Sequence, residues 1–272
     1  MSSSASNPLS PPPVTRPWSK SRVVGHVLMA LWIVAGAALV YYLSLNVVSP
    51  FFLKYWPKYV DGFLVTIQIV GLSLLIGAAL SIPIAIARSS KSRILNSLAY
   101  SYVYFFRGTP LLAQTFLIYY GAGSFRDALD NIGLWWFFRD ATYCVIFAFS
   151  LNTSAYQAEI LRGAIENVPK GQWEGGQALG LSKPVIFFKI ILPQALMVAL
   201  RPYGNEIILM IKGSAVAAVV TVFDLMGVTR LAYARSFDIS VYLWAAVLYL
   251  IVVETLRRLW DLLERYLTRH LH

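Results

Sequence analysis

The chain has 272 residues, of which 58% are hydrophobic and 13% are charged. Soluble domains carry roughly 25% charged residues, so this composition excludes an ordinary soluble domain and predicts that most of the chain lies in lipid. The net charge of +10 comes from basic residues at the ends of apolar runs. That pattern is typical of membrane anchoring and excludes a nucleic-acid-binding stripe. Cys144 is the only cysteine, which excludes an internal disulfide and a cysteine metal site.

Six apolar segments predict an all-α, polytopic membrane protein with six transmembrane helices. Residues 1–22 precede them, are rich in Ser and Pro, and predict a disordered, basic cytoplasmic tail. The predicted spans are residues 23–45, 63–87, 94–120, 142–160, 185–211 and 241–259. The first span is longer than the apolar region of a signal peptide and lacks a clear cleavage site, so we expect an uncleaved anchor.

The basic residues are distributed unevenly between the two sides of these spans. Fourteen lie in the segments on the side of the two termini, and seven lie in the loops of the other side. The positive-inside rule therefore predicts that both termini are cytoplasmic. The loops predicted outside are residues 46–61, 121–139 and 212–239. We expect the last of them to re-enter the membrane in part or to lie along its surface.

Residues 171–196 form a polar interruption between two spans, on the predicted cytoplasmic side. Gly180 breaks a first short helix. Ser182 and Pro184 restart the chain, as an N-cap and a first-turn proline do. The sequence therefore predicts a short helix, a glycine turn and a second helix.

The nearest approach to a nucleotide-binding P-loop lies at residues 175–183. Leu181 stands where the phosphate-binding lysine must be, so we expect no nucleotide site in this chain. Energy for uphill transport must then come from an ion gradient or from a separate ATPase.

The polar interruption resembles the cytoplasmic loop of permease subunits of ATP-binding-cassette importers. That loop has Glu-Ala-Ala, three residues, Gly, nine residues, Ile, one residue and Leu-Pro. The corresponding residues here are Glu174, Gly175, Gly176, Gly180, Ile190, Leu192 and Pro193. Both alanines are glycines, and each glycine costs roughly 1 kcal/mol in a helix relative to alanine. We therefore expect a softer first helix than is usual in the family.

The resemblance extends over about residues 60–270. The segments 107–110 (Arg-Gly-Thr-Pro), 152–159 and 168–171 look like the polar amino-acid branch of these importers, whose members carry histidine, lysine, arginine, glutamine or opines. That branch usually has five spans. The resemblance therefore implies a transmembrane domain at 60–270 with a coupling loop at 169–193, and an added helix at 23–45.

The resemblance also implies partners and a mechanism. This chain would form the pathway with a second permease subunit, related or identical, and would receive a polar amino acid from a periplasmic binding protein in the bacterial inner membrane. Two separate ATPase subunits would bind the ATP and Mg, so this chain is expected to bind no cofactor and to be no enzyme itself. The residues implied in ATPase coupling are Gly171, Glu174, Gly175, Gly176, Ala178, Leu179 and Gly180.

Polar residues within the predicted spans are candidates for the substrate pathway, because ionisable groups in lipid are costly and should face protein or water. Asn152, Tyr156 and Glu159 share a helical face. Arg107 and Gln114, also seven residues apart in a third span that residues 107–110 interrupt, are expected to share another. Arg107 could hold a carboxylate and Glu159 a cationic group, or the two could pair with each other or with neighbours only to stabilise the bundle. Two further candidates, which could equally form interhelical hydrogen bonds, are Asn205 and Glu206.

Two other functions remain open at this point. A membrane scaffold subunit would carry no substrate. An ion-coupled secondary transporter would show inverted repeats and broken helices, and no convincing repeat relates the two halves of the sequence.

Overall fold

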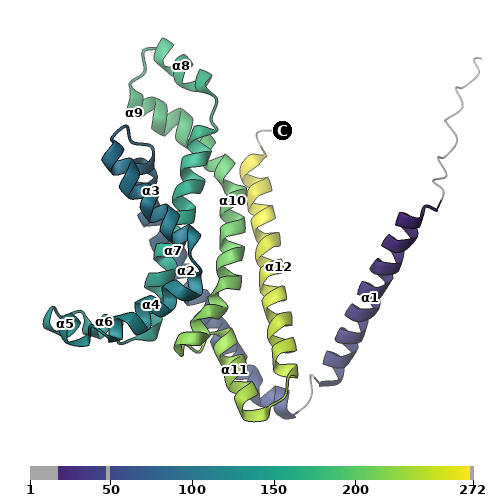
Figure 1. Cartoon of the computed structure of the whole chain (residues 1–272). Helices are drawn as coiled ribbons and strands as arrows, with labels where there is room; N and C mark the ends of the chain where they lie inside the picture. The colour runs from purple at the N-terminus through teal and green to yellow at the C-terminus, as the bar shows by residue number, and fades with distance from the viewer. Residues whose placement is uncertain (1–17, 47–49, 270–272) are drawn as a thin grey trace, which may run out of the picture. The chain divides into compact units, whose positions relative to one another are not determined.

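The structure is a computed structural model that describes residues 18–46 and 50–269 (Figure 1). All regular elements within these ranges are helices, which confirms the all-α prediction. The chain divides into two units between Lys54 and Tyr55, and each is described by itself. Most of the predicted N-terminal tail, residues 1–17, lies outside the described residues.

The first unit consists mainly of α1 (Lys20–Asn46), which covers the predicted first span. Its 27 residues extend about 40 Å at about 1.5 Å per residue, enough to cross a hydrocarbon core of about 30 Å. At its start, the Trp18 ring lies 5.1 Å from the His26 ring and 5.3 Å from the Arg22 guanidinium carbon. An aromatic and cationic cluster at a helix end is typical of the membrane–water interface.

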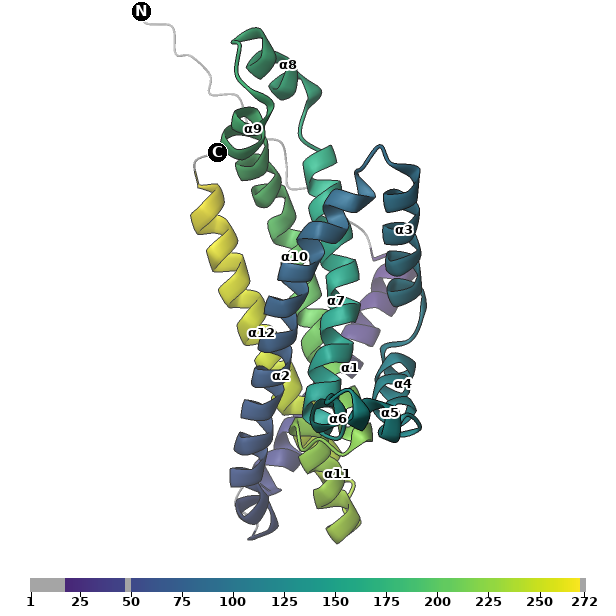
Figure 2. The same ribbon diagram turned by 90° about the vertical axis from the view of Figure 1, so that its left-hand side faces the viewer.

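The second unit is a helix bundle that begins within α2 (Pro50–Arg88). Its further elements are α3 (Arg93–Gly108), α4 (Leu111–Gly123), α5 (Arg126–Asn131), α6 (Trp135–Phe138), α7 (Ala141–Glu166), α8 (Lys170–Ala178), α9 (Lys183–Ile186), the π-helix η1 (Phe187–Ile191), α10 (Leu192–Gly213), the 3₁₀-helix η2 (Ser214–Val220), α11 (Leu225–Ser236) and α12 (Ser240–Thr268). Helix α7 packs against α3, α4 and α10. The short helix α8 lies at the opposite end of this bundle from α5, α6 and α11 in both views (Figures 1 and 2).

Four helical segments in the described chain have by themselves the length and apolar composition of a span. They are Lys20–Asn46, Phe52–Arg88, Lys183–Val220 and Ser240–Thr268. The predicted fourth span falls in α7, which buries a row of polar residues against its neighbours. Its composition is accordingly more polar than that of a lipid-facing helix.

The predicted third span, residues 94–120, is not one helix. It is broken between α3 and α4, which follow one another along the same side of α7 (Figure 2). Pro110 cannot donate a main-chain hydrogen bond and disfavours a helical conformation at the preceding residue. Thr109 is accordingly extended, with φ −111° and ψ 149°. The break falls at the interruption that the sequence shows at residues 107–110; what was wrong is the placement of Arg107 and Gln114 on one helical face across it.

The predicted outer segment, residues 212–239, packs into the bundle. Val220 of η2 belongs to a buried cluster with Ile69, Phe149 and Met210. Thr221 then takes a left-handed conformation (φ 67°), which ends η2 and turns the chain toward α11. Much of the part up to Val222 therefore lies in the core of the bundle.

The polar interruption folds as the sequence predicts. Helix α8 ends at a turn in which Gly180 has φ +72°, and α9 begins after Ser182 with Pro184 in its first turn. A second buried cluster joins this region to α7 and α10 through Ala164, Val168, Ile186, Ile191, Ala195 and Ala199. The two short helices are thus fixed to the bundle by apolar packing.

Candidate functional site

Two neighbouring grooves in the bundle share Arg107, Tyr156 and Glu159. The first, of about 360 Å³, lies between the end of α2, α3 and α7, and its further lining residues are Arg88, Tyr100, Val103, Tyr104 and Gly108. The second, of about 420 Å³, lies between α7 and α10, and its further lining residues are Ile160, Gly163, Ala164, Asn167, Val198 and Pro202. Three of the predicted pathway residues therefore lie together, where the two open grooves adjoin.

Arg107 presents a cation to both grooves. Its guanidinium carbon lies 5.1 Å from the centre of the Tyr156 ring, and the Tyr156 hydroxyl donates to the Arg107 carbonyl at 3.4 Å. No ion pair of Arg107 with a carboxylate occurs among the described residues. A planar guanidinium held over an aromatic ring and open to a groove is suited to bidentate binding of a carboxylate.

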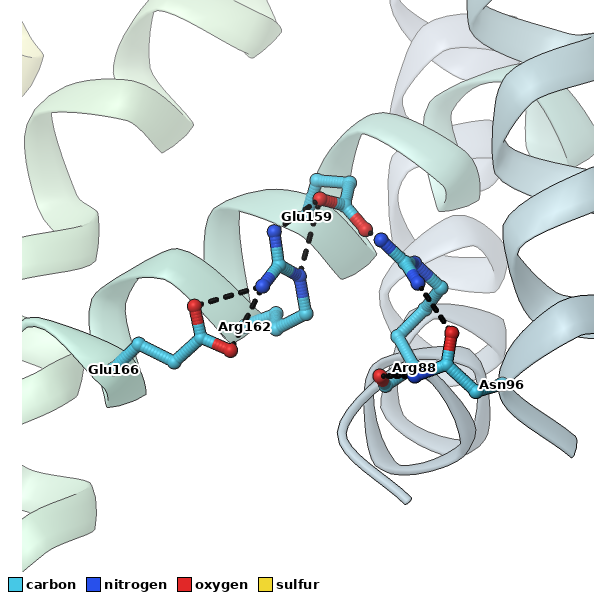
Figure 3. Close-up of polar contacts among 5 residues, drawn as sticks. All are labelled: Arg88, Asn96, Glu159, Arg162 and Glu166. Carbon is cyan, nitrogen blue, oxygen red and sulfur yellow. Dashed lines mark hydrogen bonds and ion pairs between the residues drawn. The ribbon is translucent and has the colours of Figure 1, made fainter. Parts of the chain in front are cut away.

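Glu159 is engaged by two other arginines (Figure 3). Arg88 Nε donates to Glu159 Oε1 at 2.9 Å, and Arg162 Nη2 donates to Glu159 Oε2 at 2.8 Å. Of the two pairings that the sequence left open, Glu159 pairs with neighbouring arginines and not with Arg107. Glu159 in this conformation offers no free oxygen to a cationic group in the groove.

Gln114 and Asn152 lie away from the grooves, at the α3–α4 break. Gln114 Nε2 donates to the Phe106 and Thr109 carbonyls at 2.9 and 3.1 Å. Asn152 Nδ2 donates to the Phe106 carbonyl at 2.9 Å and to Gln114 Oε1 at 3.0 Å. The face predicted to hold Arg107 and Gln114 does not exist, because the break separates them. The two amides instead satisfy carbonyls that a broken helix leaves without partners.

Asn205 and Glu206 face different surroundings on α10. Asn205 lines a separate groove of about 320 Å³ between α10 and α12, together with Arg201 and Trp260. Glu206 is 5% exposed and accepts a hydrogen bond from Thr153 Oγ1 at 2.7 Å. Glu206 therefore makes an interhelical hydrogen bond between α7 and α10, as one of the two sequence-based alternatives expects.

The predicted coupling residues lie on and directly after α8. Those that are exposed are Gly171, Glu174, Gly175, Ala178, Leu179 and Gly180, and Leu179 is 79% exposed. Gly176 is the exception, because it is buried against Ile186. The opposite face of α8 is anchored by Trp173, whose ring stacks at 6.5 Å on that of Phe187. Helix α8 therefore presents a mostly polar surface with one apolar side chain at its end.

Sequence reasoning missed Arg88 and Arg162. Both were counted only as residues that set the membrane orientation. The available signal was the spacing of Glu159, Arg162 and Glu166, because side chains three and four residues apart meet on one helical face. Nothing in the sequence indicates the contact from Arg88, which is 71 residues from Glu159.

Comparisons with known proteins identify the family of the chain. Residues 77–269 match the family model described as "Binding-protein-dependent transport system inner membrane component". The chain is 41% identical to the nopaline transport system permease protein NocM of Agrobacterium fabrum, over 79% of this chain and 90% of that protein. It is 35% identical to the arginine ABC transporter permease protein ArtM of Escherichia coli, over 78% of this chain and 95% of that protein.

Two solved structures resemble the fold. A chain from the crystal structure of an amino acid ABC transporter with histidines has a TM-score of 0.70 and 31% identity, over 79% of this chain and 96% of that chain. The methionine transporter MetNI in an inward-facing conformation has a TM-score of 0.62 and 19% identity, over 77% of this chain and 95% of that chain, and it shows the fold alone. The family model begins after α1 and covers more than half of the sequence. The chain therefore belongs to the family of inner-membrane components of binding-protein-dependent transport systems.

Proposed function

We propose that this chain is the permease subunit of an ATP-binding-cassette importer for polar or basic amino acids or opines. One observation carries the substrate side of the proposal. The Arg107 guanidinium lies over Tyr156, without a carboxylate partner among the described residues, in two grooves between spanning helices. Amino acids and opines share a carboxylate that such a cation can bind. The names of the nopaline and arginine permeases support the same class.

The partners follow from the family and from α8. Two ATPase subunits hold the exposed face of α8, carry the ATP and Mg, and drive the cycle. A second permease subunit, related or identical, completes the pathway, and a periplasmic binding protein delivers the substrate. Both termini and α8 then lie in the cytoplasm of a bacterium, with the chain in the inner membrane.

Glu174 stands on the exposed face of α8, where a carboxylate can pair with a basic residue of an ATPase. Leu179, at the end of the same helix, is the apolar side chain that an ATPase surface would cover. Gly171, Gly175, Ala178 and Gly180 are small, exposed residues around them, so both side chains stay accessible to the partner.

The test is uptake of radiolabelled L-arginine by the complete complex in liposomes, with the variant Arg107→Gln. Losing a charged hydrogen-bond donor costs about 1.5–3 kcal/mol, so KM is expected to rise about 10- to 150-fold. Arg201→Gln is the matched control, because Arg201 is an exposed arginine of α10 that lines neither groove.

Three results would contradict the proposal. An unchanged KM in Arg107→Gln removes the assigned carboxylate site. Uptake driven by an ion gradient without the ATPase indicates a secondary transporter. ATP-dependent uptake that persists without this chain indicates a scaffold subunit.

A further inference from the structure

A chain of polar side chains runs from the α2–α3 corner to the last turn of α7 (Figure 3). We name it the α7 polar chain, and its members are Asn96, Arg88, Glu159, Arg162 and Glu166. Arg88 and Glu159 also line the first groove. Glu166 is the last residue of α7. The α7 polar chain thus connects the wall of the groove to the end of the helix that precedes α8.

Arg162 is the central link. It donates through Nη2 to Glu159 Oε2 at 2.8 Å and through Nη1 to both oxygens of Glu166 at 2.7 Å. Glu159, Arg162 and Glu166 occupy positions i, i+3 and i+7, so they lie on one face of α7. One guanidinium therefore joins two successive turns of the helix.

Arg88 closes the other end. Its Nε donates to Glu159 Oε1 at 2.9 Å, and its Nη1 donates to Asn96 Oδ1 at 2.8 Å. Asn96 Nδ2 returns a hydrogen bond to the Arg88 carbonyl at 2.6 Å. The last residue of α2 and the first turn of α3 are thereby locked to each other and to α7.

The Arg88–Glu159 and Glu159–Arg162 contacts are largely removed from solvent, whereas the Glu166 side chain is 58% exposed. The side chains of Arg88, Glu159 and Arg162 are 14%, 15% and 25% exposed. Exposed ion pairs contribute little because water screens them, whereas partly buried, multiply bonded guanidinium–carboxylate pairs hold a defined geometry. Displacing one partner would leave a charge of the other in a poorly solvated place, so the members are expected to move together.

A short, partly buried linker connects α7 to α8. Three residues, 167–169, separate Glu166 from Lys170. Val168 among them is 5% exposed and packs with Ile186 and Ala164. A displacement of α8 must therefore reach the last turns of α7.

We propose that the α7 polar chain transmits the movement of α8 to the groove. When α8 moves, it displaces the end of α7. The Glu159–Arg88 pair then displaces the α2–α3 corner, which forms a wall of the first groove. Arg162 is a positioning residue in this scheme and touches no substrate. The inference rests on the proposed function, because it assigns the movement of α8 to an ATPase.

The test compares Arg162→Gln with Arg257→Gln in the complete complex with L-arginine. Arg257 is a close control. On α12 it pairs with Glu254 three residues before it and Asp261 four residues after it, the same pattern as that of Arg162, but it lines neither groove. ATP hydrolysis and L-arginine uptake are measured on the same proteoliposomes, and uptake per ATP hydrolysed is the readout. A merely stabilising role would lower the amount of assembled complex and leave this ratio unchanged.

The expected result is a ratio at least about 5-fold lower in Arg162→Gln, since coupling free energies between sites typically correspond to 5-fold or more, with a wild-type ratio in Arg257→Gln. An unchanged ratio in assembled Arg162→Gln overturns the inference. If Arg162→Gln does not assemble, Arg162→Lys replaces it. A lysine keeps the charge but cannot reach both carboxylates in the same fork, so an unchanged ratio in Arg162→Lys also overturns it. A wild-type complex without ATP-dependent uptake refutes the proposed function itself and the inference with it.

Discussion

Gly176 of α8 packs directly on Ile186 of α9. A β-carbon built on Gly176 would lie 2.8 Å from Ile186 Cγ1, whereas nothing lies within 4 Å of the same position on Gly175. Ile186 is fully buried, so it has little room to move aside. The two glycines that replace the family's alanines therefore differ. Gly176 permits the close approach of α8 and α9, and only Gly175 softens an exposed helix.

This difference gives the first prediction. Gly175→Ala is expected to stabilise the protein by up to about 1 kcal/mol and to leave the amount of bound ATPase unchanged. Gly176→Ala is expected to force α8 away from α9, and so to lower both the melting temperature and ATPase binding. Co-purification of the ATPase with tagged permease, together with thermal unfolding, measures both effects.

The double variant Gly176→Ala with Ile186→Ala tests whether a loss of ATPase binding in Gly176→Ala comes from the clash between the new methyl group and the Ile186 side chain. It removes the atoms that the new methyl group meets, so it should bind more ATPase than Gly176→Ala alone, despite the cavity cost of about 2–5 kcal/mol at Ile186. Equal ATPase binding by Gly175→Ala and Gly176→Ala would show that the close packing has no bearing on the partner.

The local elements of this fold could be predicted from sequence because local chemistry determines them. Gly180 ends a helix by its positive φ, and the apolar runs give the spanning helices by length alone. The α3–α4 break was harder to predict. Its signal, Thr109–Pro110, is visible in the sequence. The carbonyls at the break are satisfied by two amides, and one of them, Asn152, lies 46 residues from the Phe106 carbonyl that it binds.

The site was predictable only in part for the same reason. Arg107, Tyr156 and Glu159 were found because ionisable and polar residues are rare in spanning helices. Which cation Glu159 pairs with depends on the packing of α2 beside α7, where Gly77 lets the two helices approach so closely that an added β-carbon would overlap the Thr153 side chain. No periodicity in the sequence encodes that distance.

Pro202 carries the second prediction. A proline has no N–H, so the carbonyl of Val198, four residues earlier, receives no helical hydrogen bond from it. Both residues line the groove that Arg107 also lines, so an acceptor is available for the ammonium group of a bound amino acid. Pro202→Ala restores the donor and should raise KM for L-arginine about 10-fold.

A substrate analogue sharpens this test. The analogue of arginine with a hydrogen in place of the α-amino group has no donor for the Val198 carbonyl. Its inhibition constant against L-arginine uptake should therefore be the same in Pro202→Ala and in the wild type. Pro193→Ala is the control, because Pro193 is a helical proline of α10 outside both grooves. If KM for L-arginine rises equally in Pro202→Ala and Pro193→Ala, the effect comes from a change in the geometry of α10 and not from the Val198 carbonyl.

Glu206 carries the third prediction. It accepts from Thr153, which in turn accepts from Gln157 Nε2 at 3.1 Å. Glu206→Gln keeps an acceptor for Thr153 and should retain both stability and L-arginine uptake. Glu206→Leu keeps the volume but leaves the Thr153 hydroxyl without its acceptor, which should cost about 1–3 kcal/mol. Thermal unfolding and uptake are measured together, and loss of uptake in a stable Glu206→Gln variant would instead assign Glu206 to the substrate.

Asp224 carries the fourth prediction. It lies between η2 and α11, outside the helical segments long enough to span a membrane, and is fully buried. Its carboxylate caps α11 by accepting from the Gly227 N–H at 2.8 Å, and the Tyr249 hydroxyl donates to it at 3.4 Å. Burial raises the pKa of Asp224 from 3.8 to about 6, although these hydrogen bonds act in the opposite direction.

The sign of the pH effect follows from this raised pKa. The folded state holds the proton more tightly than the unfolded state, so the contribution of Asp224 to stability is complete below about pH 3.8 and is lost as pH rises through about 6. Ionisation at neutral pH then costs on the order of 3 kcal/mol. Asp224→Asn keeps an oxygen for the Gly227 N–H and cannot ionise. Its melting temperature relative to wild type should therefore rise between pH 5 and pH 7.5.

Asp140→Asn is the matched control for this pH effect. Asp140 caps α7 in the same way, accepting from the Thr142 and Tyr143 N–H groups at 2.7 and 3.2 Å, but it is exposed to solvent. Asp140→Asn therefore measures what the exchange of a capping carboxylate for an amide does to the melting temperature at an exposed cap. A difference between Asp224→Asn and wild type that does not change over this pH interval would mean that the buried carboxylate keeps its charge without cost, through the Gly227 and Tyr249 donors that surround it.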